Sequence, residues 1–226
     1  MKFLLLGRGK TGAHIEEVAH QRGHKVRVLR SADNPHGEAL SAEALRDEDI
    51  VIDFTNPESV VNNIEACARA GKNIVVGTTG WYGEVPRIKT LVEKSGNALL
   101  YGGNFSIGVN LFFEAAKTAA AALKHNYSGQ IFERHHALKK DAPSGTAMFL
   151  RDTVREASGM ELEITSFREG DVVGLHELVL NSHHDKIYLC HDAKSRRGFA
   201  EGAVLGAEWL IGKKGFFNFK DIWREL

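Results

Sequence analysis

The first thirty residues constrain the fold more than any other stretch of the chain. The unbroken apolar run Phe3–Leu6 leads directly into Gly7–Gly12, which matches the pattern G-x-G-x-x-G. A helical pattern with Ile15 and Val18 on one face follows, and Val26–Leu29 is a second apolar run. This order of strand, glycine turn, helix and strand is typical of a dinucleotide-binding unit of the Rossmann type. A glycine-rich turn without a ligand is the alternative.

The glycine turn offers what the pyrophosphate of a dinucleotide requires. Glycines let the backbone turn tightly and approach the phosphates, and the N-terminus of the next helix offers free N–H groups and a partial positive charge. From this turn we expect cofactor contacts at Gly7, Gly9, Lys10, Thr11 and Gly12.

The pattern continues to about residue 103. Apolar runs at 50–54, 73–76 and 98–101 alternate with helical patterns at 56–70 and 85–94, and a further short helix is expected at Ala42–Arg46. Runs this apolar are typical of strands buried on both faces, as in a parallel sheet. We therefore expect an α/β dinucleotide-binding domain over residues 1–103.

Ligands of such sheets bind outside the carboxyl ends of the strands, where two short turns of this chain are expected. The turn at Gly77–Gly80 reads Gly-Thr-Thr-Gly and follows one strand, and Thr55 follows another. We expect the nicotinamide end of the cofactor near these turns. The predicted contacts here and at the start of the second domain are Phe54, Thr55, Gly77, Thr78, Thr79, Asn104 and Phe105.

The residues after the second strand bear on the choice between NADPH and NADH. An acid there binds the ribose 2′-hydroxyl, whereas an arginine accommodates a 2′-phosphate. This chain has Arg30 and Ser31, with no acid before Asp33. We expect contacts from Arg30 and Ser31 and a preference for NADPH, with NADH possible. The alternative is that Arg30 is a solvated surface residue.

After the paired glycines at 102 and 103 the pattern changes. An alanine-rich helix is expected at 109–123 and a strand at Gln130–His135, and a helix begins near Ser144. The three segments that follow alternate roughly with period two, which predicts an open antiparallel or mixed sheet with one face packed on helices; they are 161–168, 175–181 and 186–190. We expect a smaller α+β domain over 104–198. The remaining segment, 199–226, carries a final helix at 200–212.

One polar stretch, 133–147, stands out between these apolar segments. It contains His135, His136 and Lys139, followed by the turn Asp-Ala-Pro-Ser-Gly-Thr at 141–146 and a helix start. The stretch is either a solvated N-terminal cap with accidental histidines or a functional site. No set of metal ligands surrounds His183, His184 or His191, and we expect no bound metal.

Global composition excludes several classes of function. Lys+Arg and Asp+Glu both number 29, so the formal net charge of zero favours neither nucleic acid nor a membrane surface as partner. No apolar stretch reaches the ~20 residues of a membrane-spanning helix, and the run at the start is too short for a signal peptide. Cys67 and Cys190 are far apart and lack metal-type spacing. We expect a cytoplasmic protein with reduced cysteines.

The stretch 133–147 is similar to the signature of the dihydrodipicolinate reductase family: Glu-x-His-His, a nearby lysine, then Asp-Ala-Pro-Ser-Gly-Thr-Ala. Glu133, His135, His136, Lys139 and Asp141–Ala147 fit it. Supporting matches span most of the chain; they include Gly7–Gly12, Asp53–Thr55, Gly77–Gly80, Asn104–Ser106, Arg168, Gly170, Gly174 and His176.

The resemblance implies an activity, a fold and an assembly. The activity is NAD(P)H-dependent reduction of the dehydrated form of 4-hydroxy-tetrahydrodipicolinate to tetrahydrodipicolinate in the diaminopimelate–lysine pathway. The implied fold joins a Rossmann-type domain to a substrate and oligomerisation domain with an open mixed sheet, and 199–226 returns to the nucleotide domain. The family is tetrameric through that sheet, so we expect a homotetramer that binds a small dicarboxylate.

The resemblance also implies a division of roles. His135 is the expected general acid, and Lys139 supplies a positive charge to the substrate. A helix start binds a carboxylate through free N–H groups and hydroxyls; the expected substrate contacts are His136, Ser144, Gly145 and Thr146. Asp141 and Pro143 are expected to shape the turn. The alternatives are another two-domain NAD(P)H oxidoreductase, such as an amino-acid dehydrogenase, and a nucleotide-binding regulator without turnover.

Overall fold

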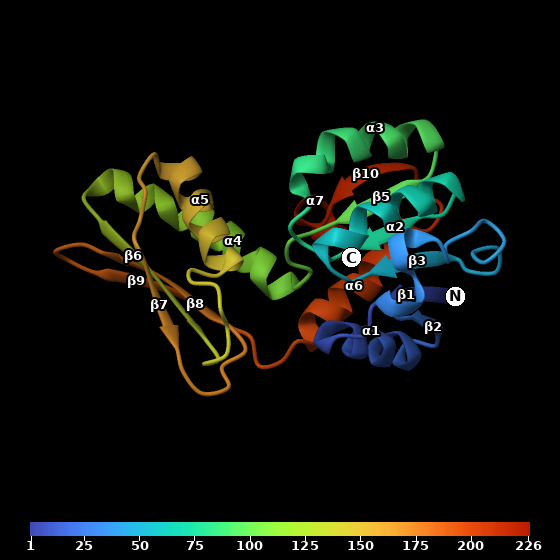
Figure 1. Cartoon of the computed structure of the whole chain (residues 1–226). Helices are drawn as coiled ribbons and strands as arrows, with labels where there is room; N and C mark the ends of the chain where they lie inside the picture. The colour runs from blue at the N-terminus through green and yellow to red at the C-terminus, as the bar shows by residue number, and fades with distance from the viewer. The chain divides into compact units, whose positions relative to one another are not determined.

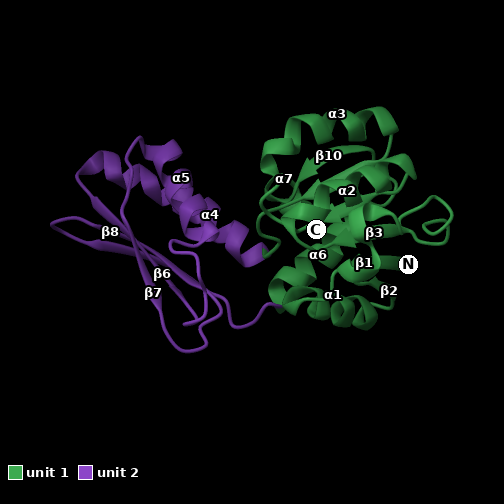
Figure 2. Ribbon diagram, in the orientation of Figure 1, with its two compact units in different colours: residues 1–106, 197–226 green, residues 107–196 purple.

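The computed structural model describes residues 1–226 and contains two compact units (Figures 1 and 2). Unit 1 comprises Met1–Ser106 and Arg197–Leu226, and unit 2 comprises Ile107–Arg196. The borders expected from the sequence were 103/104 and 198/199, within three residues of these. The difference at the first border has a packing reason, because Phe105 is buried in the core of unit 1, where its ring centroid lies 4.6 Å from that of Phe219.

Unit 1 is built on a six-stranded parallel sheet in the order β10-β5-β4-β3-β1-β2. After β1 and β2 the chain crosses to the other side of β1 to form β3, so the strand order reverses between β1 and β3, where such sheets bind ligands. The strands are β1 (Lys2–Leu6), β2 (Lys25–Leu29), β3 (Ile50–Asp53), β4 (Ile74–Val76), β5 (Ala98–Tyr101) and β10 (Gly215–Asn218).

Helices cover both faces of this sheet, which explains why its strands are apolar throughout. One hydrophobic cluster contains Ile15 of α1 (Lys10–Gln21) and Ala203 of α6 (Arg197–Leu210). A second cluster contains Ile64 of α2 (Pro57–Arg69) and Ile88 of α3 (Val85–Ser95). The two separate clusters confirm the expected doubly wound architecture.

Local signals placed several of these helices correctly. Asn56 caps α2 by accepting a hydrogen bond from Ser59 N, and Pro57 is the first helical residue, as expected. The helix expected at Ala42–Arg46 is wrong, since those residues form turns. Two elements that follow α6, the strand β10 and the short α7 (Phe219–Ile222), were not predicted from the sequence. The remaining single turns are 3-10 helices at Ser31–Asp33, Pro35–Gly37, Tyr82–Glu84 and Trp223–Glu225.

Unit 2 is a four-stranded mixed sheet in the order β7-β6-β8-β9, with two helices on one face. The strand β7 (Ile164–Arg168) is parallel to β6 (Ser128–His135), whereas β8 (Leu175–Asn181) and β9 (Lys186–Asp192) continue antiparallel. The helix α4 (Ile107–Ala119) packs on β9, and α5 (Gly145–Ser158) packs on β6. A 3-10 helix, Ala120–His125, follows α4. This arrangement confirms the open mixed sheet.

None of the helices combines the length and the apolar character that crossing a membrane requires.

Candidate active site

The glycine turn after β1 has one glycine that the packing of the protein does not explain. A Cβ at Gly7, whose φ is 86°, would lie 2.5 Å from the Phe54 carbonyl oxygen, and a Cβ at Gly12 would lie 2.4 Å from the Gly7 carbonyl oxygen. A Cβ at Gly9 would meet no protein atom within 4 Å. Gly9 is the N-cap of α1, has no side chain to cap the helix, and is followed by no acid in the first turn. This open position beside a helix N-terminus fits the pyrophosphate of a dinucleotide.

At the expected nicotinamide end, the side chains differ in how accessible they are. The Phe54 ring covers Gly77 so closely that a Cβ there would lie 2.1 Å from the ring. Thr78 is buried, and its hydroxyl donates to Asp53 Oδ1 at 2.9 Å, whereas Thr79 is exposed. The hydroxyl of Thr78 is therefore used inside the protein and is not free for a ligand.

The remaining predicted cofactor contacts of unit 1 lie in two places. Arg30 and Ser31 are exposed after β2, and Arg30 pairs with no carboxylate, unlike Arg27, which pairs with Glu48. Asn104 Oδ1 accepts a hydrogen bond from Ser106 N at 2.9 Å, and Phe105 lies in the core. No carboxylate of the protein therefore competes with a 2′-phosphate for the guanidinium of Arg30, whereas the ring of Phe105 packs in the core of unit 1.

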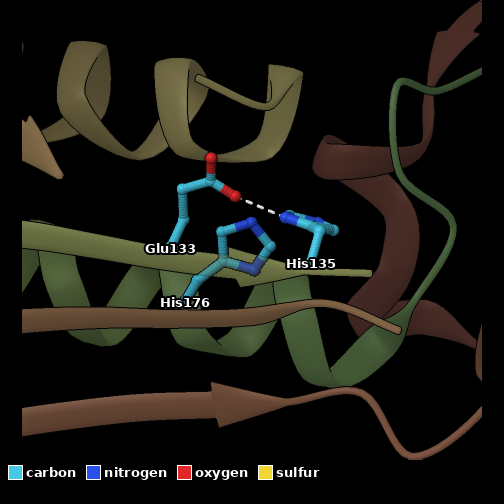
Figure 3. Close-up of side chains that lie close together, drawn as sticks. All are labelled: Glu133, His135 and His176. Carbon is cyan, nitrogen blue, oxygen red and sulfur yellow. Dashed lines mark hydrogen bonds and ion pairs between the residues drawn. The ribbon is translucent and has the colours of Figure 1, made fainter. Parts of the chain in front are cut away.

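In unit 2, the end of β6 carries two buried polar side chains. Glu133 and His135 lie on the same face of the strand, are 0% and 7% exposed, and join through Glu133 Oε2 and His135 Nδ1 (Figure 3). The register of the sheet then adds two partners, since Arg168 of β7 lies beside His135 and His176 of β8 lies beside Glu133. These four residues form what we call the Glu133 cluster.

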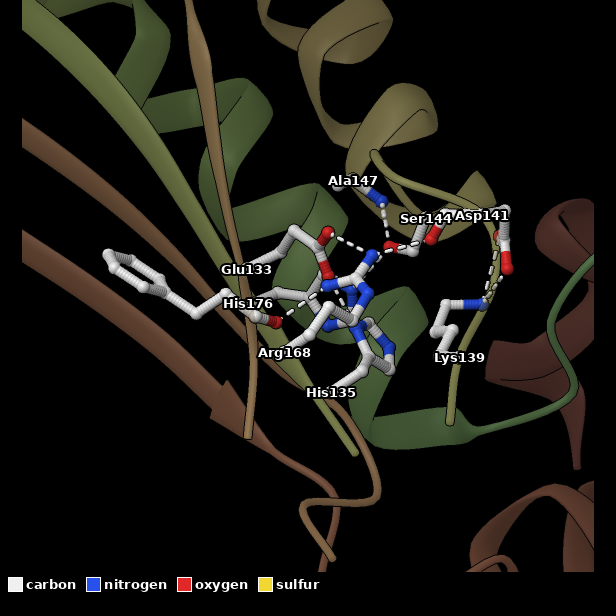
Figure 4. Close-up of polar contacts among 9 residues, drawn as sticks. Glu133, His135, Lys139, Asp141, Ser144, Ala147, Arg168 and His176 are labelled. Atoms are coloured by element: carbon white, nitrogen blue, oxygen red, sulfur yellow. Dashed lines mark hydrogen bonds and ion pairs between the residues drawn. The ribbon is translucent and has the colours of Figure 1, made fainter. Parts of the chain in front are cut away.

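Arg168 holds the Glu133 cluster to the turn that follows β6. Its Nη2 atom donates to Glu133 Oε1 at 2.7 Å and to the Asp141 carbonyl oxygen at 2.6 Å (Figure 4). Burial opposes the charge of Glu133, but its hydrogen bonds, with the one from Arg168 the strongest, outweigh this effect, so the pKa of Glu133 lies below its usual range. Glu133 is therefore an ionised acceptor at neutral pH.

This pairing determines which nitrogen of His135 can react. An ionised carboxylate only accepts hydrogen bonds, so the proton of their contact belongs to His135 Nδ1, and Nε2 is the reactive atom. A Cβ at Gly174 would lie 3.1 Å from that Nε2, so a glycine fits here without crowding the imidazole. Burial lowers the pKa of His135, although Glu133 opposes the shift. Proton donation from Nε2 requires the imidazolium, which the negative charges of a dicarboxylate would favour.

His176 connects the Glu133 cluster to the start of α5. Its Nε2 atom lies 3.1 Å from Ser144 Oγ, and its ring meets that of His135 edge-on at 5.1 Å. Burial, together with the charge of His135, lowers the pKa of His176 to about 3, so the ring is neutral. Ser144 is the N-cap of α5, is buried, and accepts from Ala147 N at 3.2 Å.

The other residues predicted to bind substrate are more open. Gly145 is exposed, a Cβ there would meet nothing within 4 Å, and Thr146 is half-buried. Lys139 Nζ lies 2.7 and 2.9 Å from the two carboxylate oxygens of Asp141, so the side chain of Asp141 holds the lysine. His136 follows the last residue of β6, is half-buried, and lies outside the Glu133 cluster. Lys139 and the first N–H groups of α5 thus offer positive charge and donors to an anion.

Glu133, His135 and His176 also resemble a set of metal ligands, because their ligand atoms lie within 4.8 Å of one another (Figure 3). The guanidinium of Arg168 is 2.7 Å from Glu133 and already supplies the positive charge that the carboxylate requires. A cation at this position would be repelled by Arg168. The geometry therefore favours a carboxylate–imidazole pair over a metal centre.

Glu133, Arg168 and His176 matched the family pattern in the sequence, but the sequence indicated no role for them. A signal for Glu133 was present, since residues two apart on a strand lie on one face, which places Glu133 beside His135. No local signal brings Arg168 and His176 to the same place, because they belong to strands whose pairing depends on the whole domain.

Comparison with known proteins covers both units. The chain matches a family model described as dihydrodipicolinate reductase, N-terminus, over residues 1–105, and one described as dihydrodipicolinate reductase, C-terminus, over residues 108–223. A 4-hydroxy-tetrahydrodipicolinate reductase of Christiangramia forsetii is 37% identical, with 100% of this chain and 99% of the relative covered. One of Thiobacillus denitrificans is 35% identical, with 79% of this chain and 74% of the relative covered.

A solved structure supports the same fold. The dipicolinate-bound dihydrodipicolinate reductase from Paenisporosarcina sp. TG-14 has a TM-score of 0.81 at 21% identity, covering 98% of this chain and 99% of that chain. Both family models match, and one relative is aligned over 99% of its length. These matches favour the reductase family over another two-domain NAD(P)H oxidoreductase such as an amino-acid dehydrogenase. The chain belongs to the dihydrodipicolinate reductase family, a family of NAD(P)H-dependent oxidoreductases.

Proposed function

We propose that this protein reduces the dehydrated form of 4-hydroxy-tetrahydrodipicolinate to tetrahydrodipicolinate, with NADPH as the preferred reductant. Relatives that are 37% and 35% identical carry the name of this reductase. The observation that carries the proposal is the buried Glu133–His135 pair, in which Nδ1 is bound to the carboxylate and Nε2 is left as the nitrogen that can exchange a proton. It lies in the same unit as Lys139 and the N-terminus of α5, which suit a carboxylate.

A nicotinamide held by unit 1 would supply a hydride to the conjugated ring of the substrate, and the protein supplies orientation, charge and a proton. Addition of that hydride to one carbon of the reduced double bond would leave the electron pair of that bond on the conjugated system as negative charge. His135 Nε2–H then donates the proton that neutralises this charge. Glu133 stabilises the imidazolium before the transfer, and afterwards the neutral ring of His135 keeps its Nδ1 proton in the hydrogen bond to Glu133. Lys139, Gly145 and Thr146 hold a carboxylate of the substrate.

Pyridine-2,6-dicarboxylate tests the substrate part of this proposal, because it is a planar dicarboxylate with no double bond that the enzyme reduces. The dihydrodipicolinate reductase from Paenisporosarcina sp. TG-14 has been solved with dipicolinate bound. We expect the compound to inhibit this protein competitively with the ring dicarboxylate substrate. Inhibition that is competitive only with NADPH would place the compound in the nucleotide site and contradict the assignment of Lys139 and α5.

Replacing Arg30 with aspartate is expected to change the preferred cofactor. The exposed guanidinium suits a 2′-phosphate, whereas a carboxylate repels the phosphate and accepts a hydrogen bond from the 2′-hydroxyl of NADH. The ratio of kcat/KM for NADPH to that for NADH should fall about 10–100-fold, a change of ~1.4–2.7 kcal/mol in discrimination. Arg27→Asp is the matched control, because Arg27 pairs with Glu48. An unchanged ratio in Arg30→Asp would remove Arg30 from the cofactor site.

The outer face of the sheet in unit 2 supports a homotetramer as part of the same proposal. On the face opposite α4 and α5, alternate residues of the four strands include Phe132, Phe167, Val179 and Tyr188. Tyr188 is 55% exposed and Phe167 is 39% exposed in the single chain. A partly apolar open sheet of this kind is a surface that a second copy would cover.

With the tetrameric assembly that the family resemblance implies, sedimentation equilibrium should give about four times the 24.9 kDa mass of the chain. Tyr188→Glu should reduce the mass, whereas Tyr82→Glu, at an exposed tyrosine of unit 1, should not. A wild-type protein that is monomeric at micromolar concentration would contradict the tetramer.

A further inference from the structure

Asp53, the last residue of β3, is a fully buried carboxylate to which neither the glycine turn nor the Glu133 cluster assigns a role. Its relative exposure is 0%. The four groups that donate hydrogen bonds to its carboxylate are all uncharged and belong to unit 1. It lies where the strand order reverses between β1 and β3. A buried carboxyl group costs stability unless its oxygens are hydrogen-bonded. The groups that donate hydrogen bonds to these oxygens show which segments of the chain Asp53 connects.

One oxygen of Asp53 ties together the two loops expected at the nicotinamide end of the cofactor. Asp53 Oδ1 accepts from Thr55 N at 3.0 Å, from Thr55 Oγ1 at 2.7 Å and from Thr78 Oγ1 at 2.9 Å. Thr55 N also donates to Thr78 Oγ1 at 2.8 Å. The loop after β3 and the loop after β4 are thus fixed to one atom.

The other oxygen connects Asp53 to the opposite end of the site through two buried amides. Asp53 Oδ2 accepts from Asn63 Nδ2 at 2.7 Å, and Asn63 Oδ1 accepts from Asn34 Nδ2 at 2.9 Å. Asn34 Oδ1 then accepts from Ala39 N at 3.1 Å. Asn63 and Asn34 are 0% and 5% exposed. Asn34 belongs to the segment that follows Arg30 and Ser31, so this relay reaches the residues expected near the 2′-phosphate.

The direction of the relay requires an acceptor at position 53. Ala39 N is a backbone donor and fixes the orientation of the Asn34 amide, which in turn fixes the amide of Asn63 with its NH2 group toward Asp53. Thr55 N, also a backbone donor, faces the other oxygen. Both oxygens therefore face N–H donors. An asparagine at 53 would point its own NH2 either at the Asn63 amide or at Thr55 N, so one of these N–H donors would lose residue 53 as its acceptor whichever way the amide is turned.

We propose that Asp53 is the positioning residue of the nucleotide site, holding the Thr55 and Thr78 loops at one end and the segment after Arg30 at the other. This inference rests on the proposed function, because it takes unit 1 to bind NADPH. Asp53 itself is buried and does not touch the cofactor. It acts by keeping both ends of the site in the geometry that binds the dinucleotide.

Asp53→Asn tests the inference, with the Kd for NADPH measured from the fluorescence of the bound nucleotide. We expect the Kd to rise about tenfold or more, because the mismatched amide frees one loop. At saturating NADPH, kcat should stay within about threefold of the wild type, since the Glu133 cluster lies in unit 2. Ile88→Ala, which truncates a fully buried side chain of α3, is the control for loss of stability alone and should leave the Kd within about twofold.

A second pair of variants keeps the inference testable if Asp53→Asn does not fold. Thr78→Val removes the hydroxyl that donates to Asp53 and accepts from Thr55 N, whereas Thr78→Ser retains it. Thr78→Val should raise the Kd for NADPH as Asp53→Asn does, and Thr78→Ser should restore wild-type binding. Wild-type Kd values in both Asp53→Asn and Thr78→Val, or an equal rise in Ile88→Ala, would overturn the inference. Failure of the wild type to bind NADPH would instead overturn the proposed function.

Discussion

Replacing His135 with alanine should lower kcat/KM for the ring dicarboxylate substrate about 10²–10⁴-fold, the usual contribution of a general acid. The variant loses the proton donor and leaves Glu133 and Arg168 paired with each other, so unit 2 should still fold. The Kd for NADPH should not change, because the glycine turn lies in unit 1. Leu138→Ala is the local control, since Leu138 is 86% exposed. Wild-type turnover by His135→Ala would show that another group protonates the product.

The pH dependence separates a general acid from a residue that only shapes the site. A general acid acts while protonated, so kcat/KM should fall as pH rises through the pKa of His135 in the free enzyme. Burial holds that pKa below its usual value of 6.5, so the fall should begin on the acidic side of 6.5. Glu133 raises this pKa, and Glu133→Gln should therefore move the fall to still lower pH. An unshifted profile in Glu133→Gln would contradict the pairing.

Replacing Lys139 with alanine should also lower kcat/KM about 10²–10⁴-fold, because the variant leaves a carboxylate of the substrate without its cation. The loss should appear both in kcat and in weaker inhibition by pyridine-2,6-dicarboxylate. Lys140→Ala provides a matched control, since the neighbouring lysine is exposed and forms no ion pair, whereas Lys139 pairs with Asp141. Equal effects of the two substitutions would show that Lys139 contributes only to the overall positive charge of the site and does not bind the carboxylate directly.

The sequence predicted the elements that local physics determines. The apolar runs, the glycine turn and the cap at Asn56 each depend on a few neighbouring residues, and the parallel sheet of unit 1 followed from them. The strand β10 was missed because four residues after a helix carry too little pattern to identify a strand. It exists because it pairs with β5, a strand more than a hundred residues earlier.

The site was predictable to the same extent. His135, Lys139 and the start of α5 lie within twelve residues of sequence, so one motif contained them. The state of His135 depends on Arg168 and His176, which only the register of β7 and β8 brings to β6. The use of Thr78 inside the protein likewise depends on a buried partner, Asp53, at the end of another strand. Burial and register are properties of the whole domain, and a pattern in one segment does not contain them.

The central claim is that this chain catalyses the reduction, and the oxidation of NADPH coupled to the preceding synthase of the diaminopimelate–lysine pathway tests it most directly. Absorbance of NADPH should fall only when the folded protein and the product of the synthase are both present. Pyridine-2,6-dicarboxylate should suppress the signal, and His135→Ala should abolish most of it. A folded wild-type protein that binds NADPH but shows no oxidation in this assay would contradict the claim.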